Sequence, residues 1–429
     1  MDIFQFVDRV KPEPCLMNDE LYLEKRRWFR WDQIQSLPLD VAYLKAVFGD
    51  HISLSVHFVG RIVLKAGVSA KGKSFVWCAE QTMISRTPSQ SVCEIDLSKM
   101  TQGNLEIFLL ALEDSAVFDG KPTASALTVN PEHILYSFLF PTYDLCCEEP
   151  LYHKLSGEGS YYSFEDGNVH LEEDSSVDLL TYFNAFSAIK WKKYTNIDSL
   201  SLYVDFEGEA WAELVHLSEE GLRSLASWKL FAPERTTLEL PLGIYPNTGI
   251  LGLRIHTERP SILHGGGWLS DAPETQPVRL GIGITTYRRE RAVKAAVARL
   301  GKAIIEHPLY HDSITITVVD NGQTLVPGDV PAATLIPNRN LGGTGGFMRS
   351  LLHYRDAGAF THCLFMDDDA SCEAGSLFRG ISFIRHAKDM SLALSGAMLS
   401  ENMQFIQWEN GAWFDKCCHP MHCNYDLRD

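Results

Sequence analysis

Three carboxylates follow an apolar run late in the chain, in the segment Leu364-Phe-Met-Asp367-Asp368-Asp369. Side chains at alternate positions of a strand point the same way, so Asp367 and Asp369 are predicted to share one hard divalent cation through their oxygens. A cation in that place would neutralise charge that develops on a departing diphosphate. The alternative is a solvated acidic turn or the first turn of a helix, where aspartate is favoured.

A glycine-rich segment, Asn338-Arg-Asn340-Leu-Gly-Gly-Thr-Gly-Gly-Phe347, runs into a helix-like stretch at 348–354. Its four glycines are unfavourable in a strand or a helix interior. They let the backbone approach a ligand closely and expose N–H groups at a helix N-terminus, so the segment is predicted to cradle a phosphate or a sugar. The spacing matches neither a Walker loop nor a dinucleotide-binding loop, and a structural glycine turn is the alternative.

Two more polar segments follow predicted strands. Thr286-Tyr-Arg-Arg289 comes after the apolar run 278–284, and Asp320-Asn-Gly322 comes after 314–319. A parallel sheet gathers its ligands at the carboxyl ends of its strands, so both segments are expected at one edge. Arg289 suits a nucleotide phosphate or base and Asn321 suits a base edge, although Asn-Gly alone is typical of a turn.

The elements that must position these residues change character near residue 277. Before it, short alternating or β-branched runs such as 53–58, 61–65, 199–205 and 251–255 predict antiparallel β-sandwiches or jelly rolls. After it, a helix-spaced stretch at 289–305 lies between strand-like runs, which predicts α/β architecture. The segment His264-Gly-Gly-Gly-Trp268 is interpreted as part of a linker. The predicted domains are 1–154, β-rich and of unknown role, 155–268, a β-sandwich, and 277–429, α/β.

Composition excludes several classes of protein. The chain has 429 residues with 38 Lys and Arg against 55 Asp and Glu, a net charge of −17, which argues against a nucleic-acid partner. No apolar run approaches the roughly 20 residues of a membrane span, and the first residues do not resemble a signal peptide. Ten scattered cysteines fit a reducing compartment, so a cytoplasmic location is expected. The basic-aromatic stretch 26–31 is interpreted as ordinary surface, with a membrane or glycan contact as the alternative.

Taken in order, the four polar segments resemble the nucleotide-sugar-dependent glycosyltransferases of family 2, which have a GT-A fold. The motif Asn340-Leu-Gly-Gly-Thr-Gly-Gly-Phe347 resembles the galactofuranosyltransferases that polymerise the mycobacterial galactan more closely than it resembles the family at large. Upstream, the segment 181–191 (TYFNAFSAIKW) is similar to the N-terminal β-sandwich of those enzymes. The resemblance covers the chain from about residue 155, and residues 1 to about 150 have no counterpart in it.

The resemblance implies a role for each matching residue. Asp367 and Asp369 would hold Mn²⁺ or Mg²⁺ on the diphosphate of a UDP-sugar, with Asp368 beside the donor. The remaining donor-binding residues would be Thr286, Arg289, Asn321, Asn340, Gly342 and Gly343. The family inverts the anomeric centre, because a carboxylate base deprotonates the acceptor hydroxyl for in-line attack.

In the family, the motif that carries the catalytic base follows the acidic triplet, and its expected position lies after the last residue of this sequence. The chain stops at Asp429, and no segment matches that motif. The catalytic base is therefore expected beyond the chain end, in a part of the catalytic domain that is missing. Trp408 and Trp413 are candidates for an acceptor wall that stacks on a sugar, with an ordinary core role as the alternative.

The sequence thus predicts transfer of galactofuranose from UDP-galactofuranose to a growing cell-surface glycan. The acceptor would be an oligosaccharide or a lipid-linked glycan. Peripheral contact with the inner face of the membrane and a homo-oligomer are further expectations. One alternative is a family 2 enzyme with another donor, such as a rhamnosyltransferase. Another is a non-catalytic glycan-binding or assembly protein. A dinucleotide oxidoreductase fits least, because its glycine loop would follow the first strand.

Overall fold

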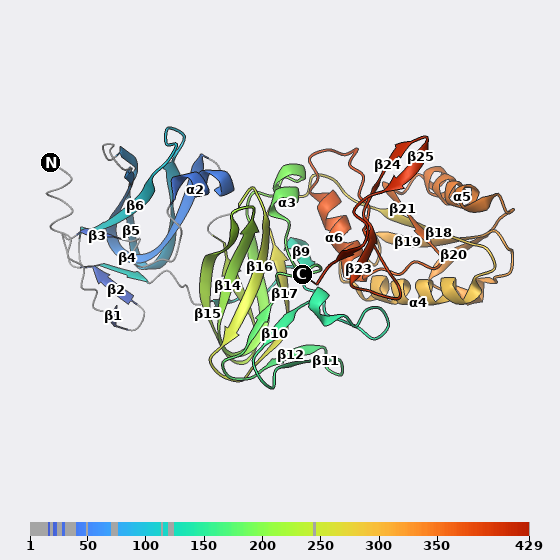
Figure 1. The fold of residues 1–429 in the computed structure, drawn as a ribbon, viewed down its shortest axis with the longest axis horizontal. Coiled ribbons are helices and arrows are strands. Elements are labelled where there is room, and N and C mark those ends of the chain that lie inside the picture. Colours follow the sequence, from blue (N-terminus) through green and yellow to red (C-terminus); the bar gives the residue numbers. More distant parts are fainter. Residues whose placement is uncertain are drawn as a thin grey trace.

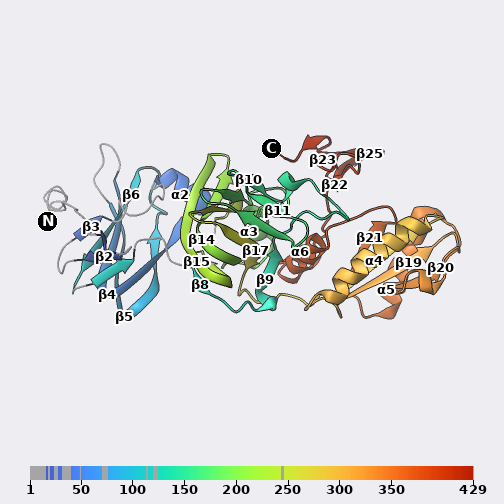
Figure 2. The same ribbon diagram turned by 90° about the horizontal axis from the view of Figure 1, so that it is seen from below.

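The computed structural model describes residues 16–17, 20–23, 28–30, 40–48, 50–69, 76–112, 115–118, 124–242 and 246–428. Figures 1 and 2 show three units in a row: a β-rich unit, a larger β-sandwich and an α/β unit. The side chains of the basic-aromatic stretch 26–31 lie outside the described residues. No helix in the described part of the chain is both long and apolar enough to cross a membrane.

The first unit is a twisted antiparallel sheet with one short helix beside it. Its seven described strands are ordered β1-β2-β7-β4-β6-β3, and β5 pairs with β4. The predicted runs 53–58 and 61–65 are one strand, β4, whose pairing with β5 shifts register between Phe58 and Gly60. The elements are β1 (Leu16–Met17), β2 (Glu20–Leu23), β3 (Trp28–Arg30), α2 (Val41–Phe48), β4 (His51–Ser69), β5 (Val76–Asp96), β6 (Asn104–Ala111) and β7 (Ser115–Phe118).

The second unit is built on ten strands and one large apolar core. Alternate residues of its long strand β14, Leu202, Val204 and Phe206, are fully buried, as the period of two predicts. Two strands from before residue 155, β8 and β9, pair with β15 and β17, so this unit begins upstream of the boundary placed from sequence. The elements are β8 (Ser125–Ala126), β9 (Ile134–Ser137), β10 (Lys154–Ser156), β11 (Tyr161–Ser163), β12 (Asn168–Leu171), β13 (Ser176–Asp178), α3 (Ala188–Tyr194), β14 (Ser201–Ser218), β15 (Gly221–Pro241), β16 (Ile250–Thr257) and β17 (Ser261–Leu269).

The interpretation of residues 264–268 as a linker was wrong. They lie within β17, which pairs with β12, β14 and β9. These positions are glycine because the backbones of the neighbouring strands β9 and β14 come very close. A Cβ on Gly267 would lie 2.4 Å from the carbonyl oxygen of Tyr136, and one on Gly266 would lie 2.6 Å from that of Tyr203. Here glycine permits packing inside a sheet rather than a change of chain direction.

The third unit contains a four-stranded parallel sheet ordered β20-β19-β18-β21. Figure 1 shows α4 and α5 on opposite faces of that sheet. α4 buries Val293, Val297 and Leu300 at helical spacing. The elements are β18 (Leu280–Thr286), α4 (Glu290–Glu306), β19 (Ile314–Asp320), β20 (Ala333–Pro337), α5 (Gly342–Ala357), β21 (His362–Asp367) and α6 (Ala374–Arg385), followed by the short strands β22 (Met398–Leu399), β23 (Ile406–Glu409), β24 (Ala412–Asp415), β25 (Cys417–Pro420) and β26 (Tyr425–Asp426).

The glycine-rich segment is helical, contrary to the expectation from glycine's low helix propensity. α5 begins at Gly342 and includes all four glycines in its first turns. The reason is packing against the sheet: a Cβ on Gly346 would lie 2.1 Å from Cγ2 of Thr285. Further along, the ring of Tyr354 lies over Gly281, and its hydroxyl donates to the carbonyl oxygen of Ile282 at 2.8 Å. Close contact with β18 offsets the poor propensity.

Helix α6 joins the sandwich to the α/β unit. The Arg379 guanidinium lies 3.7 Å from the ring centroid of Tyr136 on β9 and donates to the carbonyl oxygen of Phe183 at 2.6 Å. At the start of α6, Glu373 accepts a 2.5 Å hydrogen bond from the Tyr152 hydroxyl. Burial raises the pKa of Glu373 and lowers that of Arg379. The two units therefore share an interface that is both aromatic and hydrogen-bonded.

The end of α6 is fixed as well. Phe383 packs edge-on against Trp191 of α3, with ring centroids 4.8 Å apart. The connection between β17 and β18 is hydrogen-bonded to the same helix end: Thr275 N–H donates to Arg385 O at 2.8 Å, and the Gln276 side chain donates to Ile384 O at 3.0 Å. The connection is therefore held along its length by main-chain contacts.

A buried histidine beside this interface predicts acid sensitivity. His153 is 1% exposed, its ring nitrogens have no hydrogen-bond partner among the described residues, and burial lowers its pKa from 6.5 to about 4. In the unfolded chain His153 is protonated below about pH 6.5, whereas in the folded chain it is protonated only below about pH 4. The free energy of unfolding therefore has its full value above pH 6.5, and this titration lowers it by about 3 kcal/mol as the pH drops to 4.

The test compares urea unfolding of the wild type and of His153→Phe between pH 4 and pH 7. The difference between the two unfolding free energies should change by about 3 kcal/mol across that range. Titrating groups away from His153 are present in both chains and cancel in the difference, whereas Glu149, whose carboxylate lies 3.5 Å from His153 Nε2, is a neighbour whose titration the substitution also changes. Parallel pH profiles would contradict the prediction.

Candidate donor site at the carboxyl edge of the parallel sheet

The predicted polar residues meet at one edge of the parallel sheet. Thr286 at the end of β18 lies opposite Asp320 at the end of β19, and Thr285 lies opposite Asp367 at the end of β21. Because the strands are parallel, the segments that follow them leave from the same side. The structure thus brings together the strand ends that the sequence placed at one edge.

Asp368 is the anchored member of the acidic triplet. It is 6% exposed and accepts a 2.7 Å hydrogen bond from the Thr286 hydroxyl. The Arg289 guanidinium lies 3.3 Å from the other carboxylate oxygen and also pairs with Asp369. Hydrogen bonds and charge from Asp369, and then charge from Asp368, raise the pKa of Arg289. Thr286, Arg289 and Asp368, predicted as donor residues, therefore form one contact network.

Asp367 and Asp369 flank Asp368 and are both exposed. Their oxygens are the ligands that Mn²⁺ and Mg²⁺ prefer, so the chemistry of this pair fits such a cation. Within the described ranges, no group of three or more His, Cys, Asp or Glu side chains converges on a common point. A cation would therefore need further ligands from a diphosphate or water, and it would compete with Arg289 for Asp369.

Asn321 is 6% exposed and holds the start of the glycine-rich segment. Its side-chain nitrogen donates to Gly342 O at 3.2 Å, and its oxygen accepts from the Asn338 side chain at 2.8 Å. Asn340 accepts from the Gly342 N–H at 3.0 Å. Sequence reasoning did not select Asn338, although it opens the glycine-rich phrase. In this structure Asn321 positions the loop, and its contact with a base remains a prediction.

Gly342 and Gly343 are exposed and occupy the first two positions of α5. Gly342 has φ +76°, a left-handed conformation that glycine adopts without strain. The first N–H groups of a helix have no partner within the helix, and their partial positive charge favours an anion. The Gly342 N–H already donates to Asn340, so an anion at this helix start would meet the N–H groups that follow it.

Asp320 supports this edge and was not among the predicted site residues. It is 1% exposed, and its carboxylate accepts backbone N–H groups of Gly322, Thr324 and Leu325 at 2.7–2.9 Å. Those bonds close the loop after β19 and fix the position of Asn321. The signal available in the sequence was an aspartate directly after an apolar strand and two residues before a glycine.

The two tryptophans proposed for the acceptor lie apart from this network. Trp408 belongs to the small sheet β22-β23-β26 and Trp413 to the pair β24-β25, both separate from the parallel sheet. They are 57% and 52% exposed, and Trp413 stacks on His419 with ring centroids 4.2 Å apart. Their exposure rules out a core role in this structure. Their part in acceptor binding stays a prediction.

Comparison with known proteins gives a family match in the sandwich. Residues 156–271 match the family described as Galactofuranosyltransferase 2 N-terminal. Galactofuranosyltransferase GlfT2 of Mycolicibacterium smegmatis is 28% identical over 249 residues, which cover 54% of this chain and 38% of that protein. The protein of the same name from Mycobacterium tuberculosis matches with the same identity and coverage. The aligned part is thus well under half the length of either curated relative.

Among solved structures, the CBM22-1–GH10 modules of Clostridium thermocellum xylanase 10B match with 10% identity and a TM-score of 0.22, over 43% of this chain and 38% of that chain. The CBM22-1–CBM22-2 tandem of Paenibacillus barcinonensis Xyn10C matches with 9% identity and a TM-score of 0.21, over 60% and 88%. Likenesses this low support no inference. The sequence relatives confirm that, over about half of its residues, this chain is similar to the galactofuranosyltransferases, as its motifs predicted.

Proposed function

We propose that the α/β unit is a GT-A domain that binds a UDP-sugar, and that the chain belongs to an inverting galactofuranosyltransferase. The observation that carries the proposal is the network of Thr286, Arg289 and Asp368 beside two exposed carboxylates at the sheet edge. The similarity to galactofuranosyltransferases supports the choice of sugar. The acceptor would be a growing cell-surface glycan, oligosaccharide or lipid-linked. Contact with the inner face of a membrane and self-association remain predictions.

Each residue at this edge would have a separate role in binding a nucleoside diphosphate. Asp367 and Asp369 would hold Mn²⁺ or Mg²⁺, which when bound supplies positive charge for the departing diphosphate. Arg289, now paired with Asp369, would turn toward a phosphate, because its planar guanidinium binds phosphate oxygens well. The N–H groups at the start of α5 would face the same charge. Asp368 would keep Arg289 and Thr286 in place.

Calorimetric titration of UDP, with and without Mn²⁺, tests the proposal. Wild-type protein should bind UDP at least tenfold more tightly with Mn²⁺, and Asp367→Ala/Asp369→Ala should lose that gain. Asp312→Ala is the matched control, because its side chain is 89% exposed and precedes β19, at the opposite edge of the sheet. No binding of UDP under any condition would refute the proposed donor site.

The sugar is tested separately from the nucleotide. Competition of UDP-galactofuranose, UDP-galactopyranose and dTDP-rhamnose against bound UDP measures the preference directly. We expect UDP-galactofuranose to bind most tightly. A preference for the dTDP-sugar would instead favour a rhamnosyltransferase with the same fold.

A further inference from the structure

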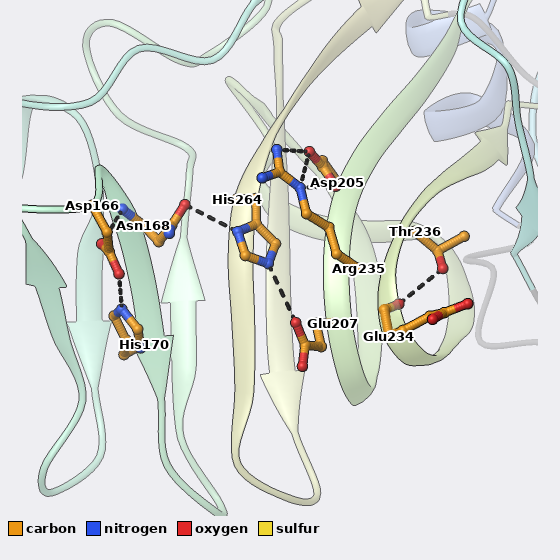
Figure 3. A network of polar contacts seen from close by, with 9 residues as sticks. All are labelled: Asp166, Asn168, His170, Asp205, Glu207, Glu234, Arg235, Thr236 and His264. Atoms are coloured by element: carbon orange, nitrogen blue, oxygen red, sulfur yellow. Dashed lines mark hydrogen bonds and ion pairs between the residues drawn. The ribbon is translucent and has the colours of Figure 1, made fainter.

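The outer face of the sandwich carries a row of polar and aromatic side chains. Strand register aligns Tyr161 of β11 with His170 of β12, then with Ile262 of β17 and Glu207 of β14. The residues next to them along the strands, such as Val169 and Leu263, are fully buried in the core. The alternation places the row on the outside of the sheet. Figure 3 shows His170, Glu207 and their polar neighbours on this face.

A cleft of about 390 Å³ opens beside this row, lined by residues that include His170, Glu172, Glu207, Gly208 and Ser261. It lies where β14 changes partner: residues 201–207 pair with β17, and residues 210–217 pair with β16. Gly208 has φ +123° at this point, and the pairing with β15 shifts register beside it. Irregularities of this kind re-aim side chains and often border binding sites. The volume is in the range of small-ligand sites.

Aromatic surface lies beside the cleft, on the strand next to its lining residue His170. Tyr161 is 53% exposed and stacks on the His170 ring, with centroids 4.9 Å apart and planes 10° from parallel. The Asp166 carboxylate lies 2.9 Å from His170 Nε2 and fixes the orientation of that ring. The rings stack face to face, so each covers one face of the other, and the exposed side of Tyr161 is a platform whose orientation is fixed before a ligand arrives. Such a platform suits the apolar face of a sugar ring.

One buried histidine points into the same network with an unused nitrogen. The His264 side chain is only 9% exposed, and its Nδ1 lies 3.1 Å from Asn168 Oδ1. Its Nε2 has no hydrogen-bond partner among the described residues, since the Glu207 oxygen lies 3.7 Å away (Figure 3). A buried polar atom without a partner costs free energy unless a ligand or water satisfies it. The side chain thus points to a hydrogen-bonding ligand at Glu207.

The charge of the cleft limits the class of ligand. Glu172 and Glu207 line it, whereas the nearby Arg235 already pairs with Asp205 through two nitrogens. Carboxylates accept hydrogen bonds from hydroxyl groups and repel anions. A neutral ligand rich in hydroxyl groups with one flat apolar face fits all of these features.

We propose that this cleft and the adjoining Tyr161–His170 stack bind a neutral oligosaccharide, with the exposed Tyr161 ring as the stacking surface and Glu207 as the hydroxyl acceptor. The site lies on the sandwich and involves none of the donor-site residues. It would hold a glycan chain independently of sugar transfer. The proposal does not depend on the donor site, and it remains testable if that site fails.

The experiment is saturation-transfer NMR followed by calorimetry on the full chain, without UDP or metal. The probes are three soluble neutral tetrasaccharides: a β-galactofuranosyl tetrasaccharide, β-1,4-galactotetraose and cellotetraose. At least one should bind, and Tyr161→Ala and Glu207→Ala should each weaken it by tenfold or more. Tyr194→Ala is the matched control, because it removes a tyrosine that is 40% exposed on α3.

Each outcome decides the proposal. Binding by none of the probes, or binding that both cleft variants retain, would overturn it. Urea unfolding like that of the wild type would show that Tyr161→Ala is folded, and unchanged UDP titrations would show that the two sites are separate. Glycan binding by a wild-type chain that does not bind UDP would refute the donor site alone, and UDP binding without glycan binding would refute the cleft proposal alone.

Discussion

Asp320→Ala is expected to lower the free energy of unfolding of the α/β unit by about 3 kcal/mol or more. The substitution removes an acceptor shared by three backbone N–H groups, those of Gly322, Thr324 and Leu325, and alanine offers no replacement. Leaving buried donors without partners costs about 1–3 kcal/mol, and more where the lost partner was charged. Urea unfolding measures the change.

Asp329→Ala is the matched control for that loop. Asp329 also accepts a backbone N–H, that of Val326 at 3.0 Å, and pairs with Lys294, but its side chain is 26% exposed. Its loss should cost about 1 kcal/mol or less. Asp320→Asn keeps one acceptor oxygen and should fall between the two. Equal destabilisation by Asp320→Ala and Asp329→Ala would contradict this account.

Gly267→Ala should destabilise the sandwich by about 3 kcal/mol. The added Cβ would lie 2.4 Å from Tyr136 O and 2.9 Å from the Ser137 Cα, so the backbone of β9 would have to move. Overpacking a well-filled core commonly costs about 1–3 kcal/mol, and a fixed neighbouring strand places this case at the upper end. The measurement is urea unfolding followed by tryptophan fluorescence, since Trp268 is fully buried next to the site.

Gly265→Ala provides a control two residues away in the same glycine run. No atom lies within 4 Å of the position that its Cβ would take. The change in stability should therefore stay within about 0.5 kcal/mol. If the two alanine variants unfold alike, the glycines of β17 serve chain flexibility and the packing explanation is wrong.

The centre of the α/β unit was predictable because its strands β18 and β19 are short, apolar and mostly buried. The runs 278–284 and 314–319 lie within two residues of β18 and β19, and the helical spacing at 289–305 matches α4. Their order along the chain also predicted that their polar ends would meet. In such a sheet, local pattern and tertiary position agree, so sequence alone carries most of the information.

The glycine-rich segments were less predictable, for one physical reason. In β17 and in α5, glycine is selected by the distance to another chain segment, Tyr136 in one case and Thr285 in the other. A prediction from local propensity takes account only of the missing side chain, and it gives a turn or a linker. Close approach is a tertiary property, and no pattern within the segment reveals it.

At the candidate site, too, the residue types were predictable from the sequence and their contacts were not. Residue types and strand order were enough to select Thr286, Arg289 and the acidic triplet. They did not reveal that Asp368 would be the buried member, or that Arg289 would pair with Asp369 in the absence of a ligand. Asn338 was missed because it acts through a hydrogen bond to the loop after β19, and Asp320 because it acts through the backbone of its own loop rather than at the exposed edge.

The docking of α6 has a consequence for dividing this protein into pieces. The helix starts five residues after Asp369, and its body packs on Tyr136 and Trp191 of the sandwich. A fragment that began at residue 277 would bring Phe383 and the Arg379 guanidinium into water without their partners. The sandwich therefore supports the folded structure of the α/β unit, and the two units should be expressed and crystallised together.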